Sequence, residues 1–159
     1  MIKEEIPSWL QAQIDKIDNL GIFGTAKPNH VLINEYKSGQ GISPHLDGTL
    51  FYPTIATISL GSQTVLNFYE PLGESEKNES CRNLTERLKY KIYIPQRSLI
   101  LIQEQMFHYY LHGIEEIERD SNCDLIVPKS IEDIKTERET RLSLTIRHVP
   151  KAKSIKIRL

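Results

Sequence analysis

The chain has 159 residues, which suits a single domain with a sizeable hydrophobic core. Its 20 Lys and Arg residues against 21 Asp and Glu residues give a formal charge of −1, which excludes a global basic field that would attract nucleic acid or an anionic membrane. No apolar run approaches the roughly 18 residues of a membrane span, and the first residues lack the apolar core of a secretory signal, so we expect an intracellular, monomeric protein of the cytoplasm or nucleus without membrane contact.

The first predicted element is an amphipathic helix in "IPSWLQAQIDKIDNLG", residues 6–21. Ser8 and Gln11 match an S-x-x-Q capping box at its start, and Gly21 is expected to end it. The helix is therefore predicted to cover one face of the core with the apolar residues that recur at helical spacing, namely Trp9, Leu10, Ile14, Ile17 and Leu20.

From residue 29 onward the apolar period changes to two, the period of β-strands. Two irregular strands are expected near 44–50 and 106–112, giving about eight in all, the number of a double-sheet jelly roll. The predicted fold is thus mainly β: a double-stranded β-helix, cupin-like, with a short N-terminal helix. The regular strands are predicted in "HVLINEYK" (30–37), "TIATISLG" (54–61), "TVLNFYE" (64–70), "YKIYIP" (90–95), "SLILIQ" (98–103) and "RLSLTIRHV" (141–149).

Two polar stretches, 71–89 and 113–140, exceed ordinary loop lengths and are interpreted as insertions. Cys81 and Cys123 lie within them and are too few for a disulfide scaffold, so both are expected to be free thiols. The expected organisation is an N-terminal helix and lead-in over 1–28, the jelly-roll domain over 29–150 and a basic tail, "KAKSIKIRL", over 151–159.

The stretch "GISPHLDGTLFYP", residues 41–53, contains a possible half of a metal site. In an extended chain residues two apart project from the same face, so His45 and Asp47 can bind one ion together. The 2-His-1-carboxylate triad of non-heme iron enzymes needs one more imidazole from another strand. His112 is the candidate, just before Gly113 at the exit of a predicted strand. Taken singly, each of these features is more typical of a polar turn or a satisfied histidine.

The last predicted strand alternates strictly between polar and apolar residues, so Arg141, Ser143, Thr145 and Arg147 share one face. Read alone, this alternation is typical of a half-exposed strand with its polar side in water. If the polar face instead lines the inside of a jelly roll, both guanidinium groups need anionic partners, because breaking a buried pair costs roughly 3–5 kcal/mol. A dicarboxylate ligand and Asp47 would supply them.

Asn34 and Tyr36, in "VLINEYKSG", also lie two apart ahead of the H-x-D turn. Their amide and phenol offer hydrogen-bond donors for a carboxylate oxygen, and a solvated strand face is the alternative.

Together the motifs resemble the AlkB-like Fe(II)/2-oxoglutarate-dependent dioxygenases. The resemblance is closer still to the branch called AlkB homologue six, through "PHLDGTLFYPTIATISLGSQTVLNFYEP" and "RLSLTIR", and it covers most of 7–150. In this comparison "GTLFYP" assigns a branch of the family rather than a chemical role. The ordered set is N-x-Y (Asn34, Tyr36), H-x-D (His45, Asp47), a distal H (His112) and R-x5-R (Arg141, Arg147).

The resemblance implies a role for each of these residues. His45, Asp47 and His112 would hold Fe(II), which 2-oxoglutarate chelates. Arg147 would face the metal side of the pocket, near Asp47 or the target group, and completes the catalytic set. Many family members have an asparagine where this chain has Ser143. The cosubstrate would be held by Arg141, which pairs with its distal carboxylate, and by hydrogen bonds from Asn34, Tyr36 and Ser143.

The reaction implied is oxidation of a modified base in single-stranded nucleic acid by O2, with release of succinate and CO2 and net demethylation of an N-methyl group. Family members usually carry a longer N-terminal segment that forms a nucleotide-recognition lid. Fewer than 35 residues precede Asn34, so residues 1–28 are interpreted as a truncated lid region.

Three alternatives stay open. The first is a non-catalytic or weakly active jelly-roll binding module, and the second is a hydroxylase of a protein substrate. The third alternative is a zinc site built from His108 and His112 as an H-x3-H pair on a helix, although "HYYLH" lacks the glutamate of an H-E-x-x-H hydrolase.

Overall fold

The computed structural model describes residues 5–72, 84–121, 124–128, 131 and 134–150. These residues form a mainly β structure with one helix before the sheets, as predicted. None of the helices in the described ranges is long and apolar enough to cross a membrane. The elements are α1 (Ser8–Asp18), β1 (His30–Tyr36), β2 (Ile42–His45), β3 (Thr54–Gly61), β4 (Thr64–Tyr69), the 3-10 helix η2 (Leu84–Arg87), β5 (Leu88–Ile94), β6 (Ser98–Gln103), α2 (Glu104–His108), β7 (Leu111–Ile114), β8 (Leu125–Ile126) and β9 (Arg141–Arg147).

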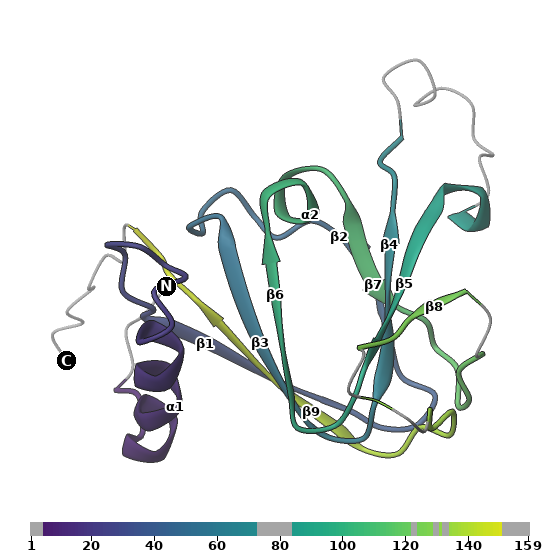
Figure 1. Cartoon of the computed structure of the whole chain (residues 1–159), viewed down its shortest axis with the longest axis horizontal. Coiled ribbons are helices and arrows are strands. Elements are labelled where there is room, and N and C mark those ends of the chain that lie inside the picture. The colour runs from purple at the N-terminus through teal and green to yellow at the C-terminus, as the bar shows by residue number, and fades with distance from the viewer. Residues whose placement is uncertain (1–4, 73–83, 122–123, 129–130, 132–133, 151–159) are drawn as a thin grey trace, which may run out of the picture.

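The strands form two sheets that face each other, the arrangement of a jelly roll (Figure 1). One sheet has the order β1-β9-β3-β6 and the other the order β2-β7-β4-β5-β8. All pairs are antiparallel except β5–β8. The predicted fold class is therefore confirmed.

The antiparallel order gives the molecule two functionally distinct ends. At the upper end in Figure 1, strands β2, β4, β6 and β9 finish and β1, β3, β5 and β7 begin. At the lower end the directions are reversed, so that Tyr36 at the end of β1 lies opposite Arg141 at the start of β9. Residues near the two ends of β9 are therefore about 20 Å apart along the strand, at roughly 3.3 Å per residue.

Helix α1 packs on the outer face of the β1-β9-β3-β6 sheet (Figure 1). Ile14 and Ile17 are buried in one cluster with Ala56 of β3 and Ile146 of β9. The predicted apolar face was partly wrong, because the side chains of Trp9 and Leu20 are 57% and 56% exposed.

The predicted capping box is also wrong. Pro7 is the N-cap residue and no side chain caps the helix. The Pro7 carbonyl accepts hydrogen bonds from the backbone amides of Leu10 and Gln11, while the Gln11 side chain donates to Asp15. Helix α1 ends at Asp18, and Gly21 follows with a φ of +70°, a left-handed conformation that favours glycine.

The six regular strands lie close to their predicted positions, whereas the two irregular ones differ. The strand expected near 44–50 is β2, which ends at His45, and residues 46–53 connect it to β3. The strand expected over 106–112 is wrong in its first half, because Met106–His108 belong to α2 and β7 begins only at Leu111. Periodicity failed here because the segment turns from helix to strand within a few residues.

The described part of the 113–140 insertion is held by a buried ion pair between Asp120 and Arg138. Arg138 Nε donates to Asp120 Oδ2 at 2.9 Å, and the guanidinium also donates to Oδ1 at 2.5 Å and to the Glu115 carbonyl at 2.6 Å. The side chains of Asp120 and Arg138 are only 2% and 5% exposed. The pair ties the two sides of the insertion together where the chain enters β9. Both cysteines lie outside the described residues, as do most of residues 71–83 and the basic tail.

Candidate active site

The eight residues singled out in the sequence all line one cavity between the two sheets. The polar face of β9 points into this cavity, since Arg141 and Ser143 are 6% and 3% exposed. The reading of β9 as a strand with its polar side in water is therefore wrong. The residues reach the cavity from four strands and the β2–β3 connection: Asn34, Tyr36, His45, Asp47, His112, Arg141, Ser143 and Arg147.

His45 and His112 face each other across the edge of the second sheet. They are register partners in the β2–β7 pair, and their ring centroids lie 4.6 Å apart. Gly113 permits this approach, because a Cβ atom there would lie 2.8 Å from the Ile42 carbonyl oxygen. His112 is the second residue of β7 and lies inside the strand, not at the strand exit that we predicted.

Asp47 lies beside the two imidazoles at the upper end of the cavity. Its Oδ2 atom is 3.5 Å from His112 Nε2, and the residue is only 8% exposed. Two imidazoles and one carboxylate form the donor set of the facial triad that binds Fe(II). Within the described part of the chain, however, no three His, Cys, Asp or Glu side chains are already gathered closely enough to hold a metal ion.

The ring nitrogens nevertheless fit a metal-binding role. His45 Nδ1 lies 2.8 Å from the Ser43 carbonyl, and an Nδ1–H donor there leaves Nε2 available as a ligand. His112 Nδ1 is buried, and no residue in the described ranges forms a hydrogen bond with it. Burial lowers the pKa of His112 to about 4, although Asp47 acts in the opposite direction. The imidazole is therefore neutral near pH 7, the form that binds metals.

Arg147 forms a hydrogen bond with the other oxygen of the Asp47 carboxylate. Its guanidinium donates to Asp47 Oδ1 at 2.7 Å, which leaves Oδ2 on the side of His112. The same guanidinium lies over the ring of Phe51, 4.5 Å from the ring centroid, a cation–π geometry. Sequence reasoning missed Phe51, because no chemical role was assigned to the "GTLFYP" segment that contains it. Only the fold brings Phe51 against Arg147.

Arg141 lies near the opposite end of the cavity and has no acidic partner in the part of the chain that is described. It donates to Ser59 Oγ at 2.8 Å and lies over the Tyr36 ring at 5.5 Å, while its buried Nε has no hydrogen-bond partner there. Burial lowers the pKa of Arg141 below its usual value. Ser59 was also missed by sequence reasoning. The alternation of side chains along β3 could have identified Ser59, because it puts Ser59 on the same face as Ile55 and Thr57.

Asn34 and Ser143 are register partners beside this arginine. Asn34 Nδ2 lies 3.4 Å from the Tyr36 hydroxyl, a long hydrogen bond that an incoming acceptor can replace. Between the two polar ends most of the cavity lining is apolar, and three threonines, Thr57, Thr64 and Thr145, also line it. The apolar part of the lining consists of Leu32, Ile42, Ile55, Leu66, Ile94, Ile100, Ile102 and Ile114.

The predicted zinc alternative fails on geometry. His108 is the last residue of α2, whereas His112 belongs to β7 and points into the cavity. An H-x3-H pair binds one metal from a continuous helix, and here the helix ends between the two histidines.

Comparison with known families settles the relationship. The family model described as the 2OG-Fe(II) oxygenase superfamily matches residues 2–147. The chain belongs to this superfamily. As the superfamily's name states, its reaction uses Fe(II) and 2-oxoglutarate, and our prediction of these as cofactor and cosubstrate is thereby confirmed.

Two curated relatives and one solved structure are also similar to this chain. The chain is 41% identical over 155 residues to ALKBH6 of Danio rerio, described as a probable RNA/DNA demethylase, and 34% identical over 152 residues to the uncharacterized protein L905 of Acanthamoeba polyphaga mimivirus. These matches include 95% and 93% of this chain but only 66% and 62% of the relatives, so the chain spans somewhat less than two thirds of their length. The structure of OsALKBH1 superposes with a TM-score of 0.55 at 17% identity over 91% of this chain and 65% of that one, which supports the shared fold.

Proposed function

We propose that the protein is an AlkB-type Fe(II)/2-oxoglutarate-dependent dioxygenase that oxidises, and thereby demethylates, a modified base of a single-stranded nucleic acid. The observation that carries this proposal is that the two ends of one cavity between the sheets differ in their side chains. One end offers two imidazoles and a carboxylate, and the other offers a buried arginine without an acidic partner in the described residues. A ligand that joins these ends needs a metal-chelating group and a distal anion, and 2-oxoglutarate has both.

At the lower end, Arg141 would bind the distal carboxylate of 2-oxoglutarate. A guanidinium fork and a carboxylate form two parallel charge-assisted hydrogen bonds, which are about twice as strong as neutral ones. The Tyr36 ring and Ser59 already hold the guanidinium in place, so little side-chain entropy is lost on binding. Asn34, Tyr36 and Ser143 would donate to the same carboxylate.

At the upper end, His45, Asp47 and His112 would hold the iron. Arg147 contributes by binding Asp47 Oδ1, which fixes the carboxylate with Oδ2 directed towards His112. When bound together, Fe(II), 2-oxoglutarate and O2 supply an oxidant that hydroxylates a nearby C–H bond, with release of succinate and CO2. The apolar side chains between the two ends would limit the number of water molecules beside this chemistry.

The nucleic acid substrate is supported by the relatives. The Danio rerio protein is described as a probable RNA/DNA demethylase, and the match includes nearly all of the present chain. Hydroxylation of an N-methyl group would give an unstable product that loses formaldehyde, which completes the demethylation.

Anaerobic titration with Fe(II) and 2-oxoglutarate tests the first step. A metal-to-ligand charge-transfer absorption band is expected in the wild-type protein and should be absent in the His45→Ala and Asp47→Ala variants. Its absence in folded wild-type protein would refute the proposal.

Turnover is tested by O2-dependent succinate formation with single-stranded oligonucleotides that carry N-methylated bases, with the same unmethylated strands as controls. Formaldehyde release that depends on the methyl group is the expected result. Charge-transfer absorption without succinate above background would identify a binding module, and stimulation by peptides alone would identify a protein hydroxylase.

A further inference from the structure

Several exposed apolar side chains lie at the upper end of the molecule, the end that holds the proposed iron ligands. In the β2–β3 connection Leu46 and Leu50 are 41% and 72% exposed, and in the second sheet and the segment before β7 Tyr90 and Tyr109 are 37% and 47% exposed. All four belong to segments at the end where β2 finishes and β5 and β7 begin (Figure 1). Apolar surface concentrated beside a functional cavity is typical of an interaction site.

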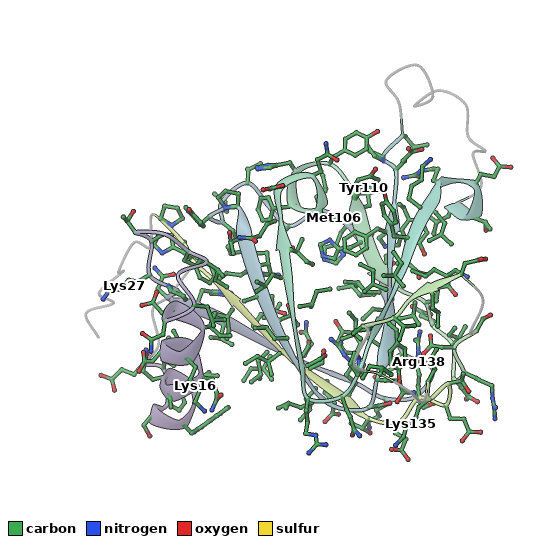
Figure 2. The ribbon with its side chains drawn as sticks, in the orientation of Figure 1. Lys16, Lys27, Met106, Tyr110, Lys135 and Arg138 are labelled. Carbon is green, nitrogen blue, oxygen red and sulfur yellow. The ribbon has the colours of Figure 1, made fainter. Side chains whose placement is uncertain are left out.

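Three tyrosines form the aromatic part of this surface, and we call Tyr90, Tyr109 and Tyr110 the tyrosine cluster. The rings of Tyr90 and Tyr110 meet edge to face with centroids 5.7 Å apart, and those of Tyr109 and Tyr110 do so at 5.0 Å. Figure 2 places Tyr110 at the upper end of the second sheet, close to Met106 of α2. Because Tyr110 packs against the core beneath, the cluster is held rigidly while its two outer rings stay accessible.

The cluster is continuous with the proposed iron ligands. On β4, Phe68 is the register partner of both Tyr90 and His112, and the centroids of the Phe68 and His112 rings lie 6.0 Å apart. Tyr110 precedes His112 by two residues, which corresponds to about 7 Å along an extended chain. A strand of linked bases that places one base in the cavity would therefore bring a neighbouring base over the tyrosines.

The charged groups beside the cluster are two cations, Lys89 and Arg87, and the carboxylate of Glu70, which leaves an excess of one positive charge. Lys89 is the chain neighbour of Tyr90, and its ammonium group is 3.1 Å from Glu70 in an exposed ion pair. Arg87 is held nearby by a hydrogen bond to the Glu70 carbonyl. Exposed ion pairs of this kind contribute little to stability, so a phosphate can compete for Lys89. Single-strand binding sites combine cationic groups with aromatic rings in this way.

We propose that the tyrosine cluster is a stacking platform for a base of a single-stranded nucleic acid, next to the base that enters the cavity. This inference rests on the proposed function for the class of substrate, and it adds the place where the rest of the strand binds. Tyr109 and Tyr90 stack on the neighbouring base, and Lys89 contacts its phosphate.

Fluorescence anisotropy of the full chain with a labelled single-stranded oligo(dT), and with the matching oligo(rU), tests this platform without requiring turnover. Stacking on one aromatic ring is worth about 1–3 kcal/mol per base, which corresponds to roughly 5- to 150-fold in affinity. Tyr109→Ala and Tyr90→Ala are each expected to weaken binding about tenfold, whereas Tyr109→Phe, which keeps the ring, is expected to bind as tightly as the wild type. Trp9→Ala is the matched control, because Trp9 is an exposed aromatic on α1, against the outer face of the other sheet, and its removal should leave affinity unchanged.

The outcomes separate this inference from the proposed function. The stacking platform is overturned if the wild type does not bind the oligonucleotides, or if the wild type and both alanine variants bind them with equal affinity. This holds even if the iron charge-transfer band forms. Loss of affinity in both Tyr109→Ala and Tyr109→Phe also overturns it, because the phenol rather than the ring face would then be responsible. Oligonucleotide binding that requires the aromatic rings supports the platform even if the charge-transfer band does not form and the proposed dioxygenase function is refuted.

Discussion

The two arginines of β9 lie at opposite ends of one cavity and differ in what surrounds them. Arg147 pairs with Asp47 and lies over Phe51, so its charge has a carboxylate partner within the protein, although its buried Nε, like that of Arg141, has no hydrogen-bond partner among the described residues. Arg141 lies over Tyr36 and donates to Ser59, and no carboxylate in the described residues pairs with it. The difference indicates that Arg147 orients another protein side chain, whereas Arg141 is arranged for an anion that the protein does not provide.

The largest expected effect follows removal of the carboxylate at the upper end. Asp47→Ala should abolish Fe(II) binding and leave Arg147, whose side chain is 12% exposed, without a carboxylate partner, which costs up to roughly 3–5 kcal/mol of unfolding free energy. Anaerobic iron titration and urea unfolding measure the two consequences. Asp15→Ala is the control, because Asp15 is an exposed aspartate on α1. Unchanged stability in Asp47→Ala would contradict the pairing of Arg147.

A third arginine sharpens the comparison. Arg138 is paired with Asp120 in the insertion, and Figure 2 shows Arg138 near the lower end of the second sheet, far from Tyr110. Asp120→Ala should lower the unfolding free energy by roughly 3–5 kcal/mol, as expected for a broken buried pair. Glu137→Ala removes the exposed partner of Arg119 and should cost less than about 1 kcal/mol. Similar losses in the two variants would show that burial does not decide the energy of these pairs.

Replacement of the unpaired arginine should change binding rather than folding. Arg141→Met removes charge-assisted hydrogen bonds worth about 1.5–3 kcal/mol, so the Kd for 2-oxoglutarate should rise roughly 10- to 150-fold. The unfolding free energy of the ligand-free protein should stay the same or increase, because an unpaired buried charge is removed. Isothermal titration calorimetry and urea unfolding test both, with Arg147→Met as the comparison that should lose stability. Equal destabilisation by the two substitutions would contradict the inference that only Arg147 has a carboxylate partner within the protein.

The smallest expected effect concerns Phe51. Phe51→Leu keeps an apolar side chain but removes the cation–π contact with Arg147, worth about 0.5–2 kcal/mol. Iron affinity should fall by roughly 2- to 10-fold as Asp47 loses its fixed orientation, and Phe51→Tyr should restore it. Anaerobic titration of the three proteins provides the measurement, and failure of tyrosine to restore affinity would assign Phe51 a packing role only.

Much of this fold was readable from the sequence because strand periodicity is a local property. The segments 54–61 and 98–103 were predicted with the bounds that β3 and β6 have. The region from Met106 to Leu111 was not, since a helix and a strand follow each other there within a few residues. Trp9 and Leu20 were misplaced because helical spacing defines an apolar stripe but not how wide a partner surface covers it.

The sequence by itself determined which side chains share a face: the i and i+2 spacing placed His45 with Asp47, Asn34 with Tyr36, and the two arginines of β9 together. It could not determine which face is the inner one, because alternation reads the same for a strand that faces water and a strand that lines a cavity. Only the packing of α1 on one side and of the second sheet on the other decided that the polar face of β9 is buried. The contacts of Arg147 with Phe51 and of Arg141 with Ser59 likewise join segments that are far apart in the chain and that long-range packing brings together.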